Sequence, residues 1–141
     1  NKFDEAEKLM EKVNQKMPNS VWSLNGLGVV HLNQGKYDLA IKELELAFEK
    51  AKNLTEADYR MAYPGNDPKF AKDRIEDIKS GIAFNLALAY EKSGNLTKAL
   101  EWYNVTKGLI ENRTNVLVAE GINKESLVAK INQIYAKNEN K

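Results

Sequence analysis

The chain has 141 residues, of which 43% are hydrophobic, and this is enough to bury the core of one domain of ordinary size. Its 21 basic and 20 acidic residues leave a formal charge of +1, so no bulk field would draw it to nucleic acid or to an anionic membrane. The absence of cysteine excludes disulfides, thiolate metal sites and a cysteine nucleophile.

The apolar runs are too short for a membrane span or a signal peptide. The sequence therefore predicts a soluble chain without a targeting segment, and it does not distinguish a cytoplasmic from an extracytoplasmic location. Because the chain begins at Asn1 with what looks like the second helix of a pair, we also expect it to be a fragment of a longer protein.

Helical periodicity starts at the N-terminus. From Phe3 to Lys16 the apolar residues recur at three- and four-residue steps, which predicts an amphipathic helix that Pro18 stops. Ser20 is a candidate N-cap for a second helix, which we expect to run up to a turn at Gly35.

A third helix is predicted from Tyr37, and its apolar stripe continues as far as Met61. The strongest break in the sequence is Pro64–Pro68, where Asp67 can cap the next helix, which should continue to Lys92. The two helices are expected to face each other across this turn as a hairpin. The third helix would contribute Leu39, Ala40, Leu44, Ala47, Phe48, Ala51, Leu54, Ala57 and Met61, and the fourth would contribute Ala71, Ile75, Ile78 and Ile82.

Two more helices are predicted toward the C-terminus. The first begins at Leu96, after Ser93–Asn95, and ends before a break that we place at Asn112–Asn115. The last covers about Lys124 to Lys137, with one apolar side and one polar side, as a terminal capping helix needs. Its apolar side comprises Leu127, Val128, Ile131, Ile134 and Tyr135.

The apolar pattern repeats along the chain. Ala6 and Ala40 are 34 residues apart, which is the period of a helix-turn-helix repeat array. Ala40 and Ala99 are 59 residues apart, 25 more than one period, and we assign the extra residues to a helical hairpin inserted between two repeats.

This pattern resembles the tetratricopeptide repeat (TPR) family, whose signature places small and large residues at fixed positions of two helices. One copy comprises Leu24, Leu27, Gly28, His31, Gly35, Tyr37, Ala40, Leu44 and Ala47, and a later copy comprises Ala83, Leu86, Ala87, Tyr90, Gly94, Leu96, Ala99 and Tyr103. The opening segment supplies Phe3, Ala6, Met10, Val13 and Pro18. Leu24 and Ala83 stand where the family often has tryptophan, and neither full repeat ends in the usual proline.

The resemblance implies an all-α fold, a TPR-like right-handed superhelical stack of antiparallel helix pairs with a long helical hairpin insertion and a C-terminal capping helix. Residues 1–141 would form a single TPR-like domain. Its parts would be the second helix of a truncated repeat (1–20), a repeat (21–54), the hairpin insertion (55–79), a second repeat (80–113), and a linker with the capping helix (114–141).

In the TPR family, partners lie in the concave groove lined by the first helices of successive repeats. Carried over to this chain, the groove would be lined by Trp22, Asn25, Val29, Asn33, Gly81, Phe84, Asn85, Leu88 and Lys92. Trp22 and Phe84 could anchor apolar side chains, and Asn25 and Asn85 could hold a peptide backbone. The alternative is that Phe84 and Leu88 pack against the hairpin and that the hairpin fills part of the groove.

A second candidate surface lies near the tip of the hairpin, where Tyr59, Arg60, Tyr63 and Phe70 cluster in the sequence. An exposed patch of aromatic residues with arginine has the composition of an interaction hot spot. Packing onto a neighbouring domain would explain the same residues equally well.

The polar candidates favour structural roles. His31, the one histidine, lies on the inward stripe of its helix, where we expect a hydrogen-bonded core residue and no catalytic or metal-binding role. Asp73, Glu76 and Asp77 crowd one helical turn, and we interpret them as a solvated face balanced by nearby lysine and arginine residues.

The sequence thus predicts a non-enzymatic protein–protein interaction module, without cofactor or metal, that binds a peptide or helix of another protein in the groove, through the hairpin, or both. It predicts no nucleic-acid partner and no membrane insertion. The alternative hypothesis is a structural spacer or self-association module in a larger assembly or envelope protein, with the hairpin mediating a homo-oligomer.

Overall fold

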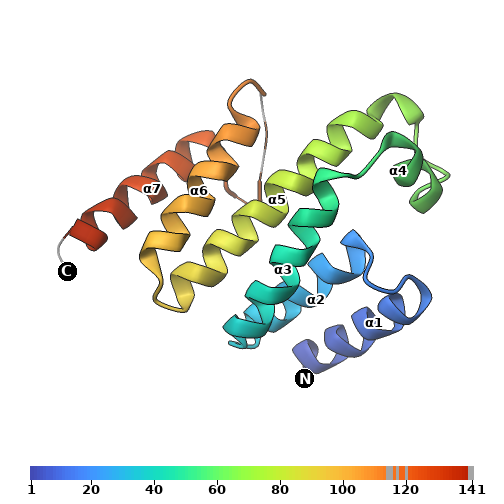
Figure 1. Ribbon diagram of the computed structural model, residues 1–141, viewed down its shortest axis with the longest axis horizontal. Coiled ribbons are helices and arrows are strands. Elements are labelled where there is room, and N and C mark those ends of the chain that lie inside the picture. The colour runs from blue at the N-terminus through green and yellow to red at the C-terminus, as the bar shows by residue number, and fades with distance from the viewer. Residues whose placement is uncertain (114–115, 117, 120, 140–141) are drawn as a thin grey trace.

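The computed structural model describes residues 1–113, 116, 118–119 and 121–139, and within these residues the regular structure is helical (Figure 1). The α-helices are α1 (Lys2–Lys16), α2 (Val21–Asn33), α3 (Tyr37–Lys52), α4 (Glu56–Ala62), α5 (Ala71–Lys92), α6 (Leu96–Ile110) and α7 (Lys124–Glu139), and a short 3-10 helix, η1, covers Pro68–Phe70. The all-α prediction is confirmed. No helix in the described ranges has both the length and the apolar character needed to cross a bilayer.

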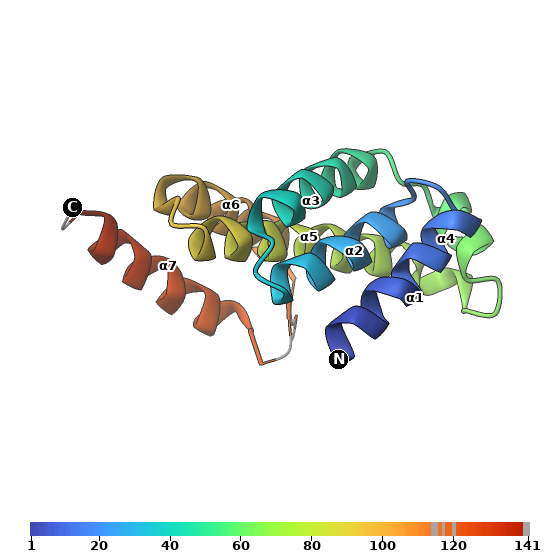
Figure 2. The same cartoon turned by 90° about the horizontal axis from the view of Figure 1, so that it is seen from below.

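The long helices pack mainly on their neighbours in the sequence. The principal contacts join α1 to α2, α2 to α3, α3 to α5, α5 to α6, and α6 to α7. Figure 2 shows α3 and α6 along one side of the molecule, α2 and α5 beside them, and α1 and α7 toward the opposite side. The helices therefore form layers in chain order, and α4 with η1 extends from the α3–α5 end (Figure 1).

Two turns of the chain have the same geometry. Gly35 and Gly94 adopt φ angles of 79° and 92°, a conformation that glycine reaches without steric cost. After each glycine, the next N–H donates to a carbonyl five residues earlier, from Lys36 to His31 and from Asn95 to Tyr90. This is the bonding pattern of a Schellman helix end, so the predicted equivalence of the two turns is confirmed.

The core consists of two large adjoining clusters of buried side chains and a small third one at α4 and the start of α5. The first joins α2, α3 and α5, and the second joins α5, α6 and α7 with Val116 and Val118. Beside the first cluster, α2 and α3 approach each other closely at Gly28. A Cβ atom added to this glycine would lie only 2.6 Å from Cγ of Leu44. A glycine at this signature position is therefore required by packing.

The prediction that the third helix continues to Met61 is wrong. α3 ends at Lys52, since the N–H groups of Asn53 and Leu54 bond to carbonyls only three residues back. Thr55 then starts α4 through a capping box, in which its hydroxyl accepts from the N–H of Asp58 and its own N–H donates to the Asp58 carboxylate.

This break changes which residues face α5. Leu54 packs against Ala71 and Ile75, as predicted, but Ala57 is exposed and Met61 is 84% exposed. Tyr59 takes the inward position instead. The restart at Thr55 turns the face of α4 relative to α3, so the helical stripe of α3 does not continue across it. Leu39, predicted in the same stripe, is also exposed.

The start of α5 agrees more closely with the sequence. The carboxylate of Asp67 accepts from the N–H of Lys69 at 3.1 Å, as expected of a capping residue, but the first turn is the 3-10 helix η1. Beyond α6, which ends at Ile110, the predicted break falls partly on residues 114 and 115, which lie outside the described residues. In α7 the side chains of Leu127, Ile131 and Ile134 are buried, whereas Val128 and Tyr135 are exposed.

Candidate protein-binding site

The candidate groove residues of α2 lie along one side of that helix. Trp22, Asn25 and Val29 are partly buried and Asn33 is exposed. The indole N–H of Trp22 and the side-chain oxygen of Asn25 are buried and have no hydrogen-bond partner within the described part of the chain. A buried polar atom without a partner costs free energy, and a ligand could satisfy these two groups only after their side chains turn outward.

On α5, the expectation that Phe84 lines an open groove is wrong. Phe84 is only 4% exposed and packs edge-on against Tyr103, with 5.6 Å between ring centroids. It shares the second core cluster with Val116 and Val118, which come from the segment after α6. The chain itself therefore covers this part of α5, and it does so with the segment after α6, not with the hairpin.

The remaining α5 candidates lie around this covered region. Asn85 and Leu88 are partly buried, and Leu88 packs at the junction of the two core clusters, while Lys92 is exposed. A Cβ atom added to Gly81 would lie 3.7 Å from the carbonyl oxygen of Val118, so the segment after α6 also passes close to this glycine. The signal that sequence reasoning overlooked was the apolar character of Val116 and Val118 in a segment interpreted only as a linker.

The predicted hairpin-tip patch is only partly a surface. Tyr59 is 5% exposed, and its hydroxyl accepts a hydrogen bond from the Asn66 side chain at 3.1 Å, so its assignment to an exposed patch is wrong. Arg60, Tyr63 and Phe70 are exposed. Lys69 places its ammonium group 5.0 Å from the centre of the Phe70 ring, a cation–π contact at the surface.

The two candidate surfaces meet at an aromatic contact. The rings of Trp22 and Tyr63 pack edge to face, with centroids 5.8 Å apart, and Tyr63 in turn lies 5.1 Å from Tyr59. Burial raises the pKa of Tyr63 above its usual value, so the phenol keeps its proton and remains a hydrogen-bond donor. The start of α2 and the end of α4 are thus parts of one surface.

A cleft of about 440 Å³ opens beside this contact, which is within the range of about 300–1,000 Å³ typical of ligand pockets. The α1–α2 turn, the end of α3, and α4 form its walls. The lining residues are Met17, Pro18, Asn19, Ser20, Val21, Trp22, Lys50, Leu54, Asp58, Met61 and Ala62. The sequence analysis did not name Met17 as a candidate binding residue, and it assigned Met61 to the interior of the hairpin.

The charged groups at the cleft are Lys50 and Asp58. Hydrogen bonds from the backbone N–H and the side chain of Thr55 lower the pKa of Asp58, which keeps this carboxylate ionised. One group of each sign therefore lies beside an apolar floor, and this arrangement suits a mainly apolar ligand with polar flanks.

His31 is the hydrogen-bonded core histidine that the sequence predicted. It is 5% exposed, and its ring nitrogens lie within hydrogen-bond distance of Glu43 and Glu7. Neither carboxylate was identified as a partner from the sequence, since Glu7 is 24 residues away. His31 is not among the residues that line the cleft.

The acidic turn of α5 is largely a charge-balanced surface. Asp77 pairs with Arg113 at 2.7 Å and with Arg74 at 3.6 Å, and Glu76 pairs with Lys79 at 3.3 Å. Across the described residues, no three histidine or acidic side chains converge in a way that could hold a metal ion.

The family model described as tetratricopeptide repeat matches residues 1–63, in agreement with the resemblance found in the sequence. Repeats of this class generally mediate protein–protein interaction. A second model, described as Domain of unknown function (DUF6340), matches residues 68–138, half of the chain, and the chain therefore belongs to that family. No curated protein and no solved structure matches the chain.

Proposed function

We propose that the chain is a non-enzymatic protein-interaction module and that it binds an apolar peptide or helix of a partner protein, with the cleft beside Trp22 as the anchor site. The observation that carries this proposal is the position of Met61. This side chain is 84% exposed and lies at an apolar cleft that also holds Trp22 and Met17. An unpaired apolar side chain of this kind gains free energy when a partner covers it.

The chemistry of the cleft suits recognition of apolar side chains. Methionine side chains are flexible and polarizable, so Met17 and Met61 can adapt to the shape of an inserted group. Trp22 supplies a large rigid apolar surface at the cleft. Lys50 and Asp58 would then select the polar residues that flank the apolar anchor.

From the cleft, the bound segment would continue along α2 past Asn25, Val29 and Asn33. Asn25 would accept a backbone N–H of the ligand once its buried side-chain oxygen turns outward. On the α5 side, Asn85, Leu88 and Lys92 remain candidates, whereas Phe84 is buried and is not. The site we propose is thus narrower than the full groove of the family.

The finer architecture belongs to the same proposal. We infer a right-handed superhelical stack in which residues 55–79 are an insertion and α7 is the cap. The succession of contacts from α2 to α3, α5, α6 and α7 supports the stack. The packing of α4 against the N-terminal half of α5 supports the insertion.

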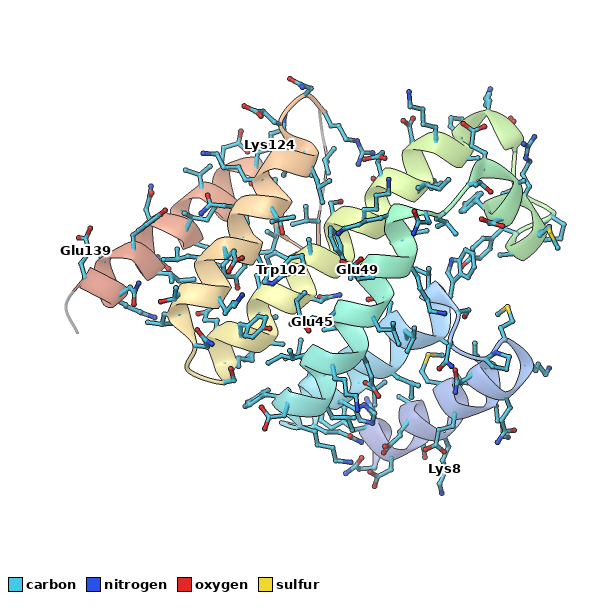
Figure 3. All side chains as sticks on the ribbon, in the orientation of Figure 1. Lys8, Glu45, Glu49, Trp102, Lys124 and Glu139 are labelled. Carbon is cyan, nitrogen blue, oxygen red and sulfur yellow. The ribbon has the colours of Figure 1, made fainter. Side chains whose placement is uncertain are left out.

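Peptide selection with fluorescence detection tests the proposal. Figure 3 shows Trp102 on α6, on the side of α3 that carries Glu45 and Glu49, where it packs on Phe48 with 4.9 Å between centroids. The Trp102→Phe variant therefore leaves Trp22 as the single indole. Peptides selected from a random displayed library should shift its emission on binding.

Met61→Ser should weaken the binding of these peptides by about tenfold or more, as expected for an anchor worth over about 1.4 kcal/mol. The matched control is Leu46→Ser, at an exposed leucine on α3 that does not line the cleft. Peptides that bind both variants as tightly as the parent protein would disprove the cleft as the site.

The alternative function, a spacer or self-association module, has one observation in its favour. Exposed apolar side chains occur in the hairpin region, with Met61 and Tyr63 at α4 and Phe70 in η1. A concentration series in light scattering tests it. Stable oligomers that Tyr63→Asp dissociates would favour self-association through the α4 region over binding of a separate partner.

A further inference from the structure

His31 connects three helices through both nitrogens of its ring. Nδ1 lies 2.6 Å from a carboxylate oxygen of Glu43 on α3, and Nε2 lies 3.0 Å from a carboxylate oxygen of Glu7 on α1. Ionised carboxylates only accept hydrogen bonds, so both contacts require the ring to donate twice. A neutral imidazole has one N–H, and therefore this geometry fits the doubly protonated, positively charged form.

The other polar groups around His31 come from the turn between α2 and α3. Gln34 donates its side-chain N–H to Glu7 at 2.9 Å, and the ammonium group of Lys36 lies 3.8 Å from the same carboxylate. The charged groups near the ring are therefore Glu7, Glu43 and Lys36. With His31 charged, the two acidic and two basic groups balance.

The pKa directions agree with this geometry. Burial, the largest single cause, lowers the pKa of His31, but the hydrogen bonds and charge attraction to Glu43 and Glu7 together outweigh it, and the net pKa is raised above its usual 6.5. Hydrogen bonds from Gln34 and His31 lower the pKa of Glu7, while burial raises the pKa of Glu43.

Helix α1 depends strongly on this contact. None of its residues is buried, whereas each of the other described α-helices has at least one buried residue. Its further attachments are a partly buried apolar stripe, with Met10 against Gly26, and the Asn14 side chain, which accepts from Ser23 at 3.1 Å. Because no residue of α1 is fully buried, the charged contact through Glu7 adds to a helix that is otherwise held by partly buried side chains.

We propose that the attachment of α1 is proton-dependent: α1 is held on α2 and α3 while His31 carries both ring protons, and it detaches more readily once one of them leaves. In the neutral ring, one nitrogen presents a lone pair to a carboxylate oxygen, and that oxygen loses the donor it has on the charged ring. The two negative charges then also repel each other across the ring.

The direction with pH follows from linkage. Because the folded pKa of His31 lies above its unfolded value, its contribution to stability is fully present below about pH 6.5 and is lost as the pH rises through the folded pKa. Met17–Ser20, which follow α1 directly, form one wall of the cleft. If the cleft binds a partner, as the proposed function states, detachment of α1 would also change the wall of the cleft and so change partner binding.

Two measurements on the free protein test the inference. Since His31 is the one histidine in the chain, its ring gives a single NMR titration curve. Native-state hydrogen exchange between pH 5.5 and 8.5, corrected for intrinsic exchange rates, gives the opening equilibrium of α1. For each unit by which the His31 pKa of the parent protein exceeds that of the Glu7→Gln variant, which keeps only the Glu43 contact, that equilibrium constant should rise about tenfold across the titration, while the constant for α6 stays unchanged.

The variant Glu7→Gln should bring the His31 pKa toward its usual value and remove most of the pH dependence of α1 opening. The matched control, Glu11→Gln, changes an exposed glutamate one turn later on α1 and should preserve both. The inference is overturned by a His31 pKa at or below 6.5, by α1 protection that is constant with pH, or by equal loss of protection in α1 and α6. These readouts do not involve a partner, so they stand whether or not the cleft binds peptides.

Discussion

Replacing Phe84 with alanine separates the buried position seen in the structure from the groove position expected from the sequence. The ring is 4% exposed, packs edge-on against Tyr103, and belongs to the core cluster that includes Val116 and Val118. Deleting a ring from such a site removes its transfer free energy and leaves a cavity, with a typical cost of about 3–5 kcal/mol. A residue lining an open groove would cost roughly 0.5 kcal/mol or less.

Urea unfolding followed by circular dichroism at 222 nm measures this difference. With a slope of about 1–3 kcal/mol per molar urea, Phe84→Ala should lower the midpoint by at least about 1 M. Asn85→Ala, at the adjacent and partly buried position, serves as the control and should shift the midpoint little. A loss below about 1 kcal/mol for Phe84→Ala would show that Phe84 is not a core residue.

The same experiment identifies what covers Phe84. In a double-mutant cycle, Phe84→Ala and Val118→Ala should show a coupling free energy of about 0.5 kcal/mol or more, because residues in direct contact are not additive. Additive effects would mean that the segment after α6 does not pack on this ring.

Three further substitutions test other parts of the fold. Gly28→Ala puts a methyl group 2.6 Å from Cγ of Leu44 and should cost about 1–3 kcal/mol in urea unfolding, and shortening Leu44 to alanine in the same chain should give a smaller additional loss than it does alone. Thr55→Ala removes the hydroxyl of the capping box and should destabilise α4 by about 1 kcal/mol, seen as faster hydrogen exchange in α4 but not in α6. Tyr103→Phe removes the hydrogen bond to Glu91 at 2.7 Å and should cost about 1 kcal/mol, and an unchanged melting temperature would contradict this.

Sequence patterns predicted the helices well wherever the helical spacing of apolar residues ended at a glycine or proline that stops a helix. Gly35 and Gly94 mark turns that only a left-handed backbone can make, and Pro64–Pro68 cannot continue a helix, so these boundaries are local properties of the chain. The buried histidine was also predictable, because the apolar stripe of α2 leaves no outward position for residue 31.

The errors arose where packing or a competing cap decided the outcome. An apolar stripe continues through residues 52–57, but Thr55 and Asp58 satisfy their backbone groups locally and restart the helix, which exposes Met61 and buries Tyr59. Phe84 was misplaced because its cover comes from Val116 and Val118, more than 30 residues later. Contacts of this range have no periodic signature, so the cleft and the covered part of α5 required the structure.

The position of the turn at Pro64–Pro68 has a consequence for how the chain can be divided. The first family match ends just before it, at residue 63, and the second begins at its last residue, 68. The first core cluster nevertheless crosses this point, since Leu44, Ala47 and Ala51 of α3 pack with Ile82, Leu86 and Ala89 of α5. Separate expression of the two segments would expose both sides of that cluster to water, and we therefore expect each to aggregate or remain unfolded, while the joined chain unfolds in one cooperative transition.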